Sequence, residues 1–155
     1  MIPDVPRAAH DRTAQHGGMR LVIADDDPVV RSALCLQLNN SFAVVGDARD
    51  ADEAIERVDA LRPDVVIVDV EMPAGGGLRA TQEIRSRAPE VAIVALSSDE
   101  SDSMVREMLR AGAMTYLRKG INGHELDSVL RAAIDAHASF YSEGASPPAG
   151  PPAGP

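Results

Sequence analysis

The sequence predicts an α/β fold in which five parallel strands form a doubly wound sheet flanked by five helices. Short unbroken runs of apolar, mostly β-branched residues alternate with longer segments whose apolar residues recur at helical spacing. Unbroken apolar runs are typical of strands covered on both faces, and their alternation with helices is typical of a parallel sheet. The expected strands are residues 21–24, 42–45, 65–68, 91–96 and, more weakly, 114–117.

The first expected helix follows the first strand. Asp27 has the side chain of a helix N-cap, and Pro28 suits the first helical position. The same stretch holds the only cysteine, Cys35, which cannot form an internal disulfide and is interpreted as a buried, unreactive thiol. The face expected to pack inward consists of Val30, Ala33, Leu34, Gln37 and Leu38.

A capping-box pattern marks the second expected helix. Asp50 is followed three residues later by Glu53, a spacing at which the two side chains can satisfy backbone N–H groups at a helix start. This helix is expected to face inward through Ala54, Ile55 and Val58.

Helix-terminating and helix-capping residues delimit the remaining three helices. The third is expected over residues 78–88, before Pro89, and the fourth over residues 102–111, before Gly112. Asn122 is expected to cap the fifth helix. The apolar face of that helix consists of Leu126, Val129, Leu130, Ala133 and Ile134.

Composition divides the 155 residues into three parts. Residues 1–18 show no periodic apolar pattern and are expected to form a flexible arm. Residues 144–155 are rich in proline and glycine, which is typical of a tail or a truncated linker. Residues 19–143 are therefore predicted to form one domain, long enough to bury a core without disulfides.

Charge and hydropathy exclude several classes of partner. The chain has 24 acidic and 15 basic residues, a net charge of −9, and few aromatic residues, so we expect no direct nucleic-acid binding. No apolar run approaches the roughly 18 residues of a membrane span, and the N-terminal residues lack a signal-peptide pattern. We therefore expect a cytoplasmic protein without a membrane partner.

Polar side chains follow four of the five expected strands. In a doubly wound sheet, ligands bind beyond the carboxyl ends of the strands, so these residues are the candidates for function. The second strand ends in Gly46-Asp47 and is expected to contribute less. The candidates are Asp25 and Asp26 after the first strand, Asp69 after the third, Ser97 after the fourth and Lys119 after the fifth.

Each candidate also has an ordinary explanation when taken alone. Asp25 and Asp26 could lie in a solvated turn, and Ser97 could form a local hydrogen bond before a helix. Asp69 is harder to explain in this way, because an unpaired charge at the end of a buried strand costs several kcal/mol. Lys119 is the only lysine beside fourteen arginines, and a compact ammonium suits a point contact with a phosphoryl oxygen.

The combination of these residues predicts a phosphoryl-transfer site. If the first and third strands are neighbours, Asp25, Asp26 and Asp69 converge, and three carboxylates that close repel one another unless a cation lies among them. Oxygen ligands of this kind suit Mg²⁺. A carboxylate beside such an ion, with the Lys119 ammonium and the Ser97 hydroxyl nearby, can act as the nucleophile toward a phosphoryl group.

The segments that carry these residues resemble the receiver domain of bacterial two-component response regulators, in particular the NarL/FixJ type. No segment is specific by itself, but all of them occur in the family's order and spacing. The matching segments are residues 21–31, residues 64–73 with Gly77, residues 94–98 and residues 112–119.

The resemblance implies the flavodoxin-like strand order 2-1-3-4-5 and a metal-assisted phospho-acceptor site. Asp69 would accept the phosphoryl group. Asp25 and Asp26 would hold Mg²⁺ together with Asp69, and the backbone carbonyl of Glu71 would be a further ligand. The chain would assist only the phosphorylation and dephosphorylation of its own aspartate and would not otherwise be an enzyme.

The resemblance also implies a switch and a set of partners. Lys119 and Ser97 would contact the phosphoryl group, and Tyr116 would be the aromatic residue that moves inward on activation. The exposed surface of the fourth helix, fifth strand and fifth helix would then change. A sensor histidine kinase would donate the phosphoryl group, a homodimer is compatible with the family, and an output domain or partner would act in transcription regulation.

Several positions depart from the family's commonest pattern. Ser97 stands where threonine is commoner, which preserves the hydroxyl, and Gly120 follows the lysine where many receivers have proline. Residues 74–77 are unusually rich in glycine and suggest a mobile lid beside the acceptor. Glu71 and Asp99 are acids at positions that flank the phosphoryl site, and we expect them to affect access to it.

Three other interpretations fit less well. A phosphatase of the haloacid-dehalogenase type needs a second aspartate two residues after Asp69, where this chain has Glu71. A nucleotide or flavin site needs a phosphate cradle after the first strand, where this chain has three aspartates. The stronger alternative is a receiver-like interaction module that is not phosphorylated in vivo.

Overall fold

The computed structural model describes residues 18–98 and 101–142, and these residues contain a single sheet of five strands. The strand order is β2-β1-β3-β4-β5, and every neighbouring pair is parallel. The predicted doubly wound sheet and its order are confirmed. The strands are β1 (Arg20–Ala24), β2 (Ala43–Ala48), β3 (Val65–Asp69), β4 (Ala92–Ser97) and β5 (Thr115–Arg118).

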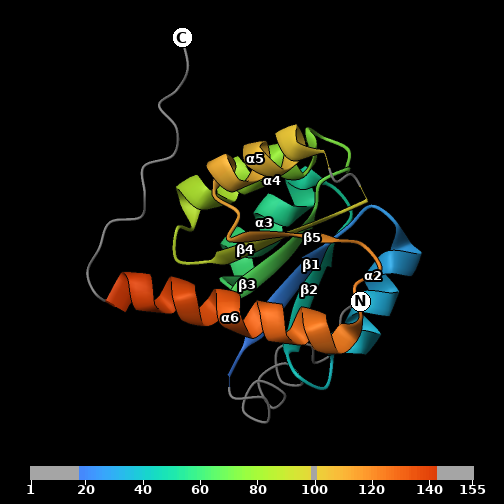
Figure 1. Ribbon diagram of the computed structural model, residues 1–155, viewed down its shortest axis with the longest axis vertical. Coiled ribbons are helices and arrows are strands. Elements are labelled where there is room, and N and C mark those ends of the chain that lie inside the picture. Colours follow the sequence, from blue (N-terminus) through green and yellow to red (C-terminus); the bar gives the residue numbers. More distant parts are fainter. Residues whose placement is uncertain (1–17, 99–100, 143–155) are drawn as a thin grey trace.

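Five helices in the described part of the chain cover the two faces of the sheet. They are α2 (Pro28–Leu38), α3 (Ala51–Leu61), α4 (Gly76–Arg87), α5 (Asp102–Ala111) and α6 (Gly123–Ser142). Helices α2 and α6 lie on one face, and α3, α4 and α5 lie on the other (Figure 1). The molecule is therefore a three-layer α/β/α sandwich.

Alternating strand residues supply one hydrophobic cluster on each face of the sheet. On β1, Leu21 and Ile23 pack with α2 and α6, whereas Val22 and Ala24 pack with the opposite layer of helices. Every residue of β3 and β4 is buried. Burial on both faces explains why these strands are unbroken apolar runs in the sequence.

The predicted helix boundaries at four positions are confirmed by their backbone and side-chain geometry. Asp27 and Asp50 each accept a hydrogen bond from a first-turn backbone N–H, at 2.9 and 2.8 Å. Asn122 does the same for α6 at 2.8 Å. Gly112 follows α5 with a φ of 124°, a conformation that favours glycine.

Helix α4 begins two residues earlier than predicted, inside the glycine-rich segment. Gly75 and Gly76 have positive φ angles of 101° and 73°, and the N–H of Gly77 donates to the carbonyl of Val70 at 2.8 Å. A Cβ on Gly77 would lie only 2.5 Å from the carbonyl oxygen of Asp69. Gly77 thus packs closely against the end of β3 at the start of α4, and the mobile lid expected at residues 74–77 stays a prediction.

Helix α2 and strand β2 also differ from the expectation. Ala33 and Gln37 are exposed, because α2 lies over the edge of the sheet and buries only a narrow stripe that includes Leu34. Cys35 is half-buried and not fully buried, and this burial raises the pKa of its thiol. Strand β2 extends through Asp47, whose carboxylate pairs with a guanidinium of α2 at 3.1 Å on the open edge.

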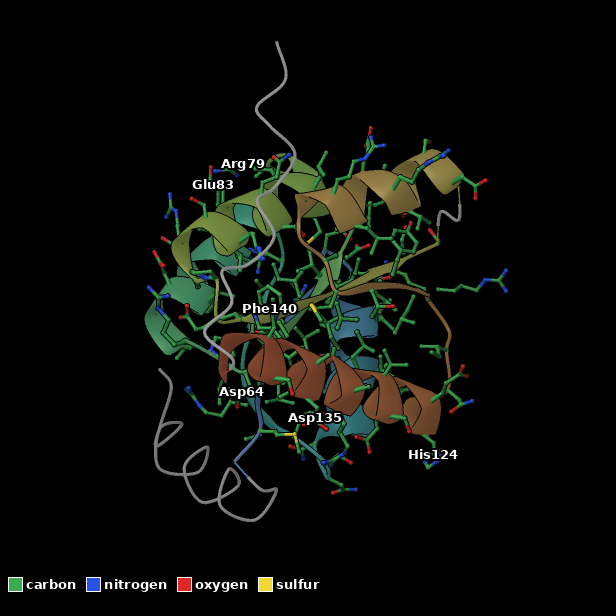
Figure 2. All side chains as sticks on the ribbon, turned by 60° about the vertical axis from the view of Figure 1, so that its left-hand side comes forward. Asp64, Arg79, Glu83, His124, Asp135 and Phe140 are labelled. Atoms are coloured by element: carbon green, nitrogen blue, oxygen red, sulfur yellow. The ribbon has the colours of Figure 1, made fainter. Side chains whose placement is uncertain are left out.

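Helix α6 is the longest of the described helices. His124 and Asp135 lie on its outer side (Figure 2). The buried imidazole of His137 contacts the carbonyl oxygen of Pro89 at 2.8 Å and joins the helix to the loop before β4.

Some predictions concern residues outside the described ranges. The arm at residues 1–18, apart from Gly18, the tail at residues 144–155 and Asp99 lie there. Among the helices that are described, none combines the length and apolarity needed to cross a membrane.

Candidate functional site

Four elements bring the predicted polar residues together at the carboxyl edge of the sheet. Asp25 directly follows β1, Asp69 ends β3, Ser97 ends β4 and Lys119 directly follows β5. Strands β1 and β3 are adjacent and parallel, and β3 is paired with β4 through Asp69 itself. The parallel register therefore places residues from distant parts of the chain at one edge.

The Lys119 ammonium lies between two buried carboxylates. Its Nζ is 3.1 Å from Oδ2 of Asp25 and 3.2 Å from Oδ1 of Asp69. Both aspartates are only 1% exposed, whereas the Lys119 side chain is 23% exposed. One cation thus faces two anions in a region where water screens charge poorly.

Hydrogen bonds to main-chain atoms hold the backbone of the site residues in position. The N–H of Lys119 donates to the carbonyl of Ser97 at 2.9 Å, and the N–H of Asp25 donates to the carbonyl of Ala48 at 2.9 Å. A guanidinium nitrogen of Arg31 donates to the carbonyl of Asp25 at 2.8 Å. The site is therefore attached to the sheet on both sides.

The electrostatics of the site leave a deficit of positive charge. Burial, and next the charge of Asp25, raise the pKa of Asp69 to about 7, against the lowering effect of the backbone N–H of Glu71 and of Lys119. Burial lowers the pKa of Lys119, but its hydrogen bond to Asp25 and the charge of Asp69 outweigh burial and raise it overall. The lysine stays charged, and the second carboxylate remains only partly compensated.

The acidic residues fit a divalent cation. Carboxylate oxygens of Asp25, Asp26 and Asp69 lie within 4.8 Å of one another, and Asp26 is exposed to solvent. Oδ2 of Asp69 is buried without a hydrogen-bond partner among the described residues. An unsatisfied carboxylate oxygen beside two further oxygen donors is the ligand chemistry that Mg²⁺ prefers.

The side chain of Glu71 occupies the hydroxyl side of the site, which the sequence analysis did not predict. Its Oε1 accepts a hydrogen bond from Oγ of Ser97 at 2.5 Å, and its Oε2 accepts one from Oγ of Ser98 at 2.9 Å. The sequence marks Glu71 only by its position two residues after Asp69. Nothing in the local pattern indicates a contact that spans 26 residues of chain.

Tyr116 lies on β5, in register with Ala95 of β4. It is half-buried and packs against the cluster formed with α3, α4 and α5. Its strand is thus the neighbour of the strand that ends in Ser97, and the switch role expected for Tyr116 stays a prediction.

Comparisons with known proteins agree with this geometry. The family model described as the response regulator receiver domain matches residues 21–131. The transcriptional regulatory protein YxjL of Bacillus subtilis is 36% identical over 124 residues, which are 79% of this chain and 57% of that protein. The DNA-binding transcriptional activator DevR/DosR of Mycobacterium tuberculosis is 37% identical over 115 residues, 73% of this chain and 53% of that protein. The chain thus spans about half the length of these relatives.

Solved structures show the same architecture. The signal receiver domain of NarL from Mycobacterium tuberculosis superposes with a TM-score of 0.73 at 28% identity, over 76% of this chain and 96% of that one. A LuxR-family response regulator from Aurantimonas sp. SI85-9A1 superposes with a TM-score of 0.71 at 28% identity, over 76% and 85% of the two chains. The chain belongs to the response regulator receiver domain family of two-component signalling proteins, and its relatives are regulators of the NarL/LuxR type.

Proposed function

We propose that this domain accepts a phosphoryl group from a sensor histidine kinase on the carboxylate of Asp69, with Mg²⁺ bound beside it. The observation that carries the proposal is the ammonium of Lys119, held 3.1 and 3.2 Å from Asp25 and Asp69. Such a cation opposes the negative charge of an incoming phosphoryl group at the same point where the nucleophile lies.

Each residue of the site has a part in the transfer. A carboxylate oxygen of Asp69 forms a bond to phosphorus while the bond from phosphorus to the kinase histidine breaks, and the departing nitrogen keeps the electron pair. Lys119 compensates charge on one phosphoryl oxygen. Asp25, Asp26 and the backbone carbonyl of Glu71 would hold Mg²⁺ together with Asp69, and the ion would supply further charge compensation.

Phosphorylation would change the surface through a two-state equilibrium. The Ser97 hydroxyl donates a hydrogen bond to the new phosphoryl group, and Tyr116 moves toward the space that this hydroxyl vacates. These contacts favour one of two arrangements of α5, β5 and α6. The wider role is inferred from the relatives, which are transcriptional regulators of which the matched segment is about half. The switched surface would control an output domain, a partner or a homodimer in transcription regulation.

The test uses beryllofluoride, which mimics an aspartyl phosphate, on the full chain with saturating Mg²⁺. We expect amide resonances around Ser97 and Tyr116 to shift, and acetyl phosphate to add one phosphoryl group to the intact mass. Asp69→Asn should abolish both responses, whereas Glu56→Gln, an exposed residue of α3, should leave them unchanged. A wild-type chain without either response would instead support the receiver-like interaction module that is not phosphorylated.

A further inference from the structure

Glu71 connects the phospho-acceptor to the hydroxyls at the end of β4. Its backbone N–H donates to Oδ1 of Asp69 at 3.2 Å, while its two carboxylate oxygens accept hydrogen bonds from Ser97 at 2.5 Å and Ser98 at 2.9 Å. Ser97 is fully buried, whereas Glu71 and Ser98 are exposed. One side chain at the mouth of the site therefore holds two consecutive hydroxyls from a different strand.

This arrangement competes with the contact that phosphorylation needs. A serine hydroxyl carries a single proton and can donate one strong hydrogen bond at a time. In the structure the Ser97 proton is directed to Glu71, so a phosphoryl group on Asp69 can receive it only after this bond has broken. A carboxylate acceptor makes the existing bond stronger than one between neutral groups.

The position of Ser98 extends the effect beyond the site itself. Ser98 is the last described residue before the connection to α5, which begins at Asp102. Glu71 thus binds the hydroxyl of the residue that directly follows β4. Release of Glu71 would therefore free the hydroxyls of both Ser97 and Ser98.

We propose that Glu71 is a positioning residue that acts as a latch for the unphosphorylated state, by holding the hydroxyls of Ser97 and Ser98 until a phosphoryl group displaces it. The proposal rests on the proposed function, because it assigns the Ser97 hydroxyl to the phosphoryl group. The proposal predicts the sign of the effect: a variant that cannot hold these hydroxyls should bind a phosphoryl group or its analogue more tightly.

The test compares three variants of the full chain by titration with beryllofluoride at saturating Mg²⁺, followed by the amide resonances near Asp69. Because Glu71→Gln removes the charge but keeps the side-chain length, we expect about tenfold tighter binding. Ser98→Ala removes one of the two latch bonds without touching Asp69, Lys119 or Ser97, and we expect about threefold tighter binding. The double variant should bind no more tightly than Glu71→Gln alone, because Ser98 acts only through Glu71.

The alternative is simple repulsion between the Glu71 carboxylate and an incoming anion. Repulsion predicts that Glu71→Gln binds more tightly, that Ser98→Ala equals the wild type and that the two changes do not interact. That result, or equal binding by all variants, would overturn the latch. Glu56→Gln controls for the loss of one exposed acidic charge and should bind like the wild type.

Failure of the latch can be told apart from failure of the proposed function. If the wild type and every variant show no response to beryllofluoride, the phospho-acceptor assignment fails and the latch fails with it. If the wild type responds and the variants follow the repulsion pattern, the assignment stands and only the latch is rejected.

Discussion

Charged side chains are exposed at the edge of the sheet formed by the amino ends of the strands, but buried at the edge formed by the carboxyl ends. At the amino edge, the backbone N–H of Arg20 donates to a carboxylate oxygen of Asp64 at 2.7 Å, and the guanidinium of Arg62 pairs with Glu90 at 2.8 Å. The side chains of that ion pair are 48% and 53% exposed. At the carboxyl edge, Asp25 and Asp69 are 1% exposed and share one ammonium.

This difference separates stability from function. The ion pair at the amino edge is exposed to solvent and therefore contributes little to stability. Charges at the carboxyl edge are buried with an excess of carboxylate, which costs folding free energy and is relieved only by a proton or a cation. The edge that is electrostatically unfavourable in isolation is the edge suited to binding a metal ion and a phosphoryl group.

The largest effect is expected from removing the ammonium that lies between Asp25 and Asp69. Because Lys119→Met leaves two buried carboxylates without a counter-charge, we expect a loss of about 3 kcal/mol in the free energy of unfolding at pH 8, without Mg²⁺. Adding Asp69→Asn should restore most of the loss, as measured by urea unfolding. Equal destabilisation by Lys119→Met in both backgrounds would show that the two side chains do not interact.

The next effect is a gain in stability on removing the charge of Asp69. Since the pKa of Asp69 is raised from 3.8 to about 7, the folded state binds this proton more tightly than the unfolded state. Its contribution is most favourable below about pH 4, is lost as the pH rises to about 7, and is then constant.

Asp69→Asn should therefore raise the free energy of unfolding by about 2 kcal/mol at pH 8 without Mg²⁺ and flatten its decline between these pH values. Chemical denaturation across the pH range measures both. Asp52→Asn, an exposed acid of α3, is the matched control and should keep the wild-type slope. A variant no more stable than the wild type would contradict the carboxylate excess at this edge.

A smaller effect is expected from the glycine that packs against the acceptor. A Cβ on Gly77 would lie 2.5 Å from the carbonyl oxygen of Asp69 and 2.7 Å from Cα of Val70, so Gly77→Ala must displace the end of β3. We expect a loss of about 1–2 kcal/mol of stability together with weaker beryllofluoride binding. Gly120→Ala, where nothing lies within 4 Å but φ is 93°, separates backbone strain from crowding. If Gly77→Ala lowered stability but left beryllofluoride binding unchanged, crowding at the end of β3 would have no effect on the site at Asp69.

The smallest effect belongs to the amino edge. Glu90→Gln removes the exposed ion pair with Arg62, and we expect a change below about 0.5 kcal/mol that disappears at high salt. Thermal unfolding at low and high ionic strength provides the measurement. If Glu90→Gln lowered the free energy of unfolding as much as Lys119→Met does, the two edges would not differ in the way described.

The predictability of the site follows the same physical logic as the fold. Asp25, Asp69, Ser97 and Lys119 were predictable because each ends or follows an apolar strand, and parallel strands all present their carboxyl ends to one edge. The close packing of Gly77 could not be predicted, because close packing against the backbone and backbone flexibility both favour glycine in the sequence.

The sequence by itself determined the succession of strands and helices along the chain and most helix caps, and it predicted which polar residues meet at the carboxyl edge. These are local properties: apolar periodicity, and side chains that bond to backbone groups a few residues away. Tertiary structure alone decided that Glu71 holds Ser97 and Ser98, that Gly77 contacts the end of β3, and that one lysine lies between two aspartates. Such contacts depend on how distant segments are oriented once the sheet has formed, and no local pattern records that orientation.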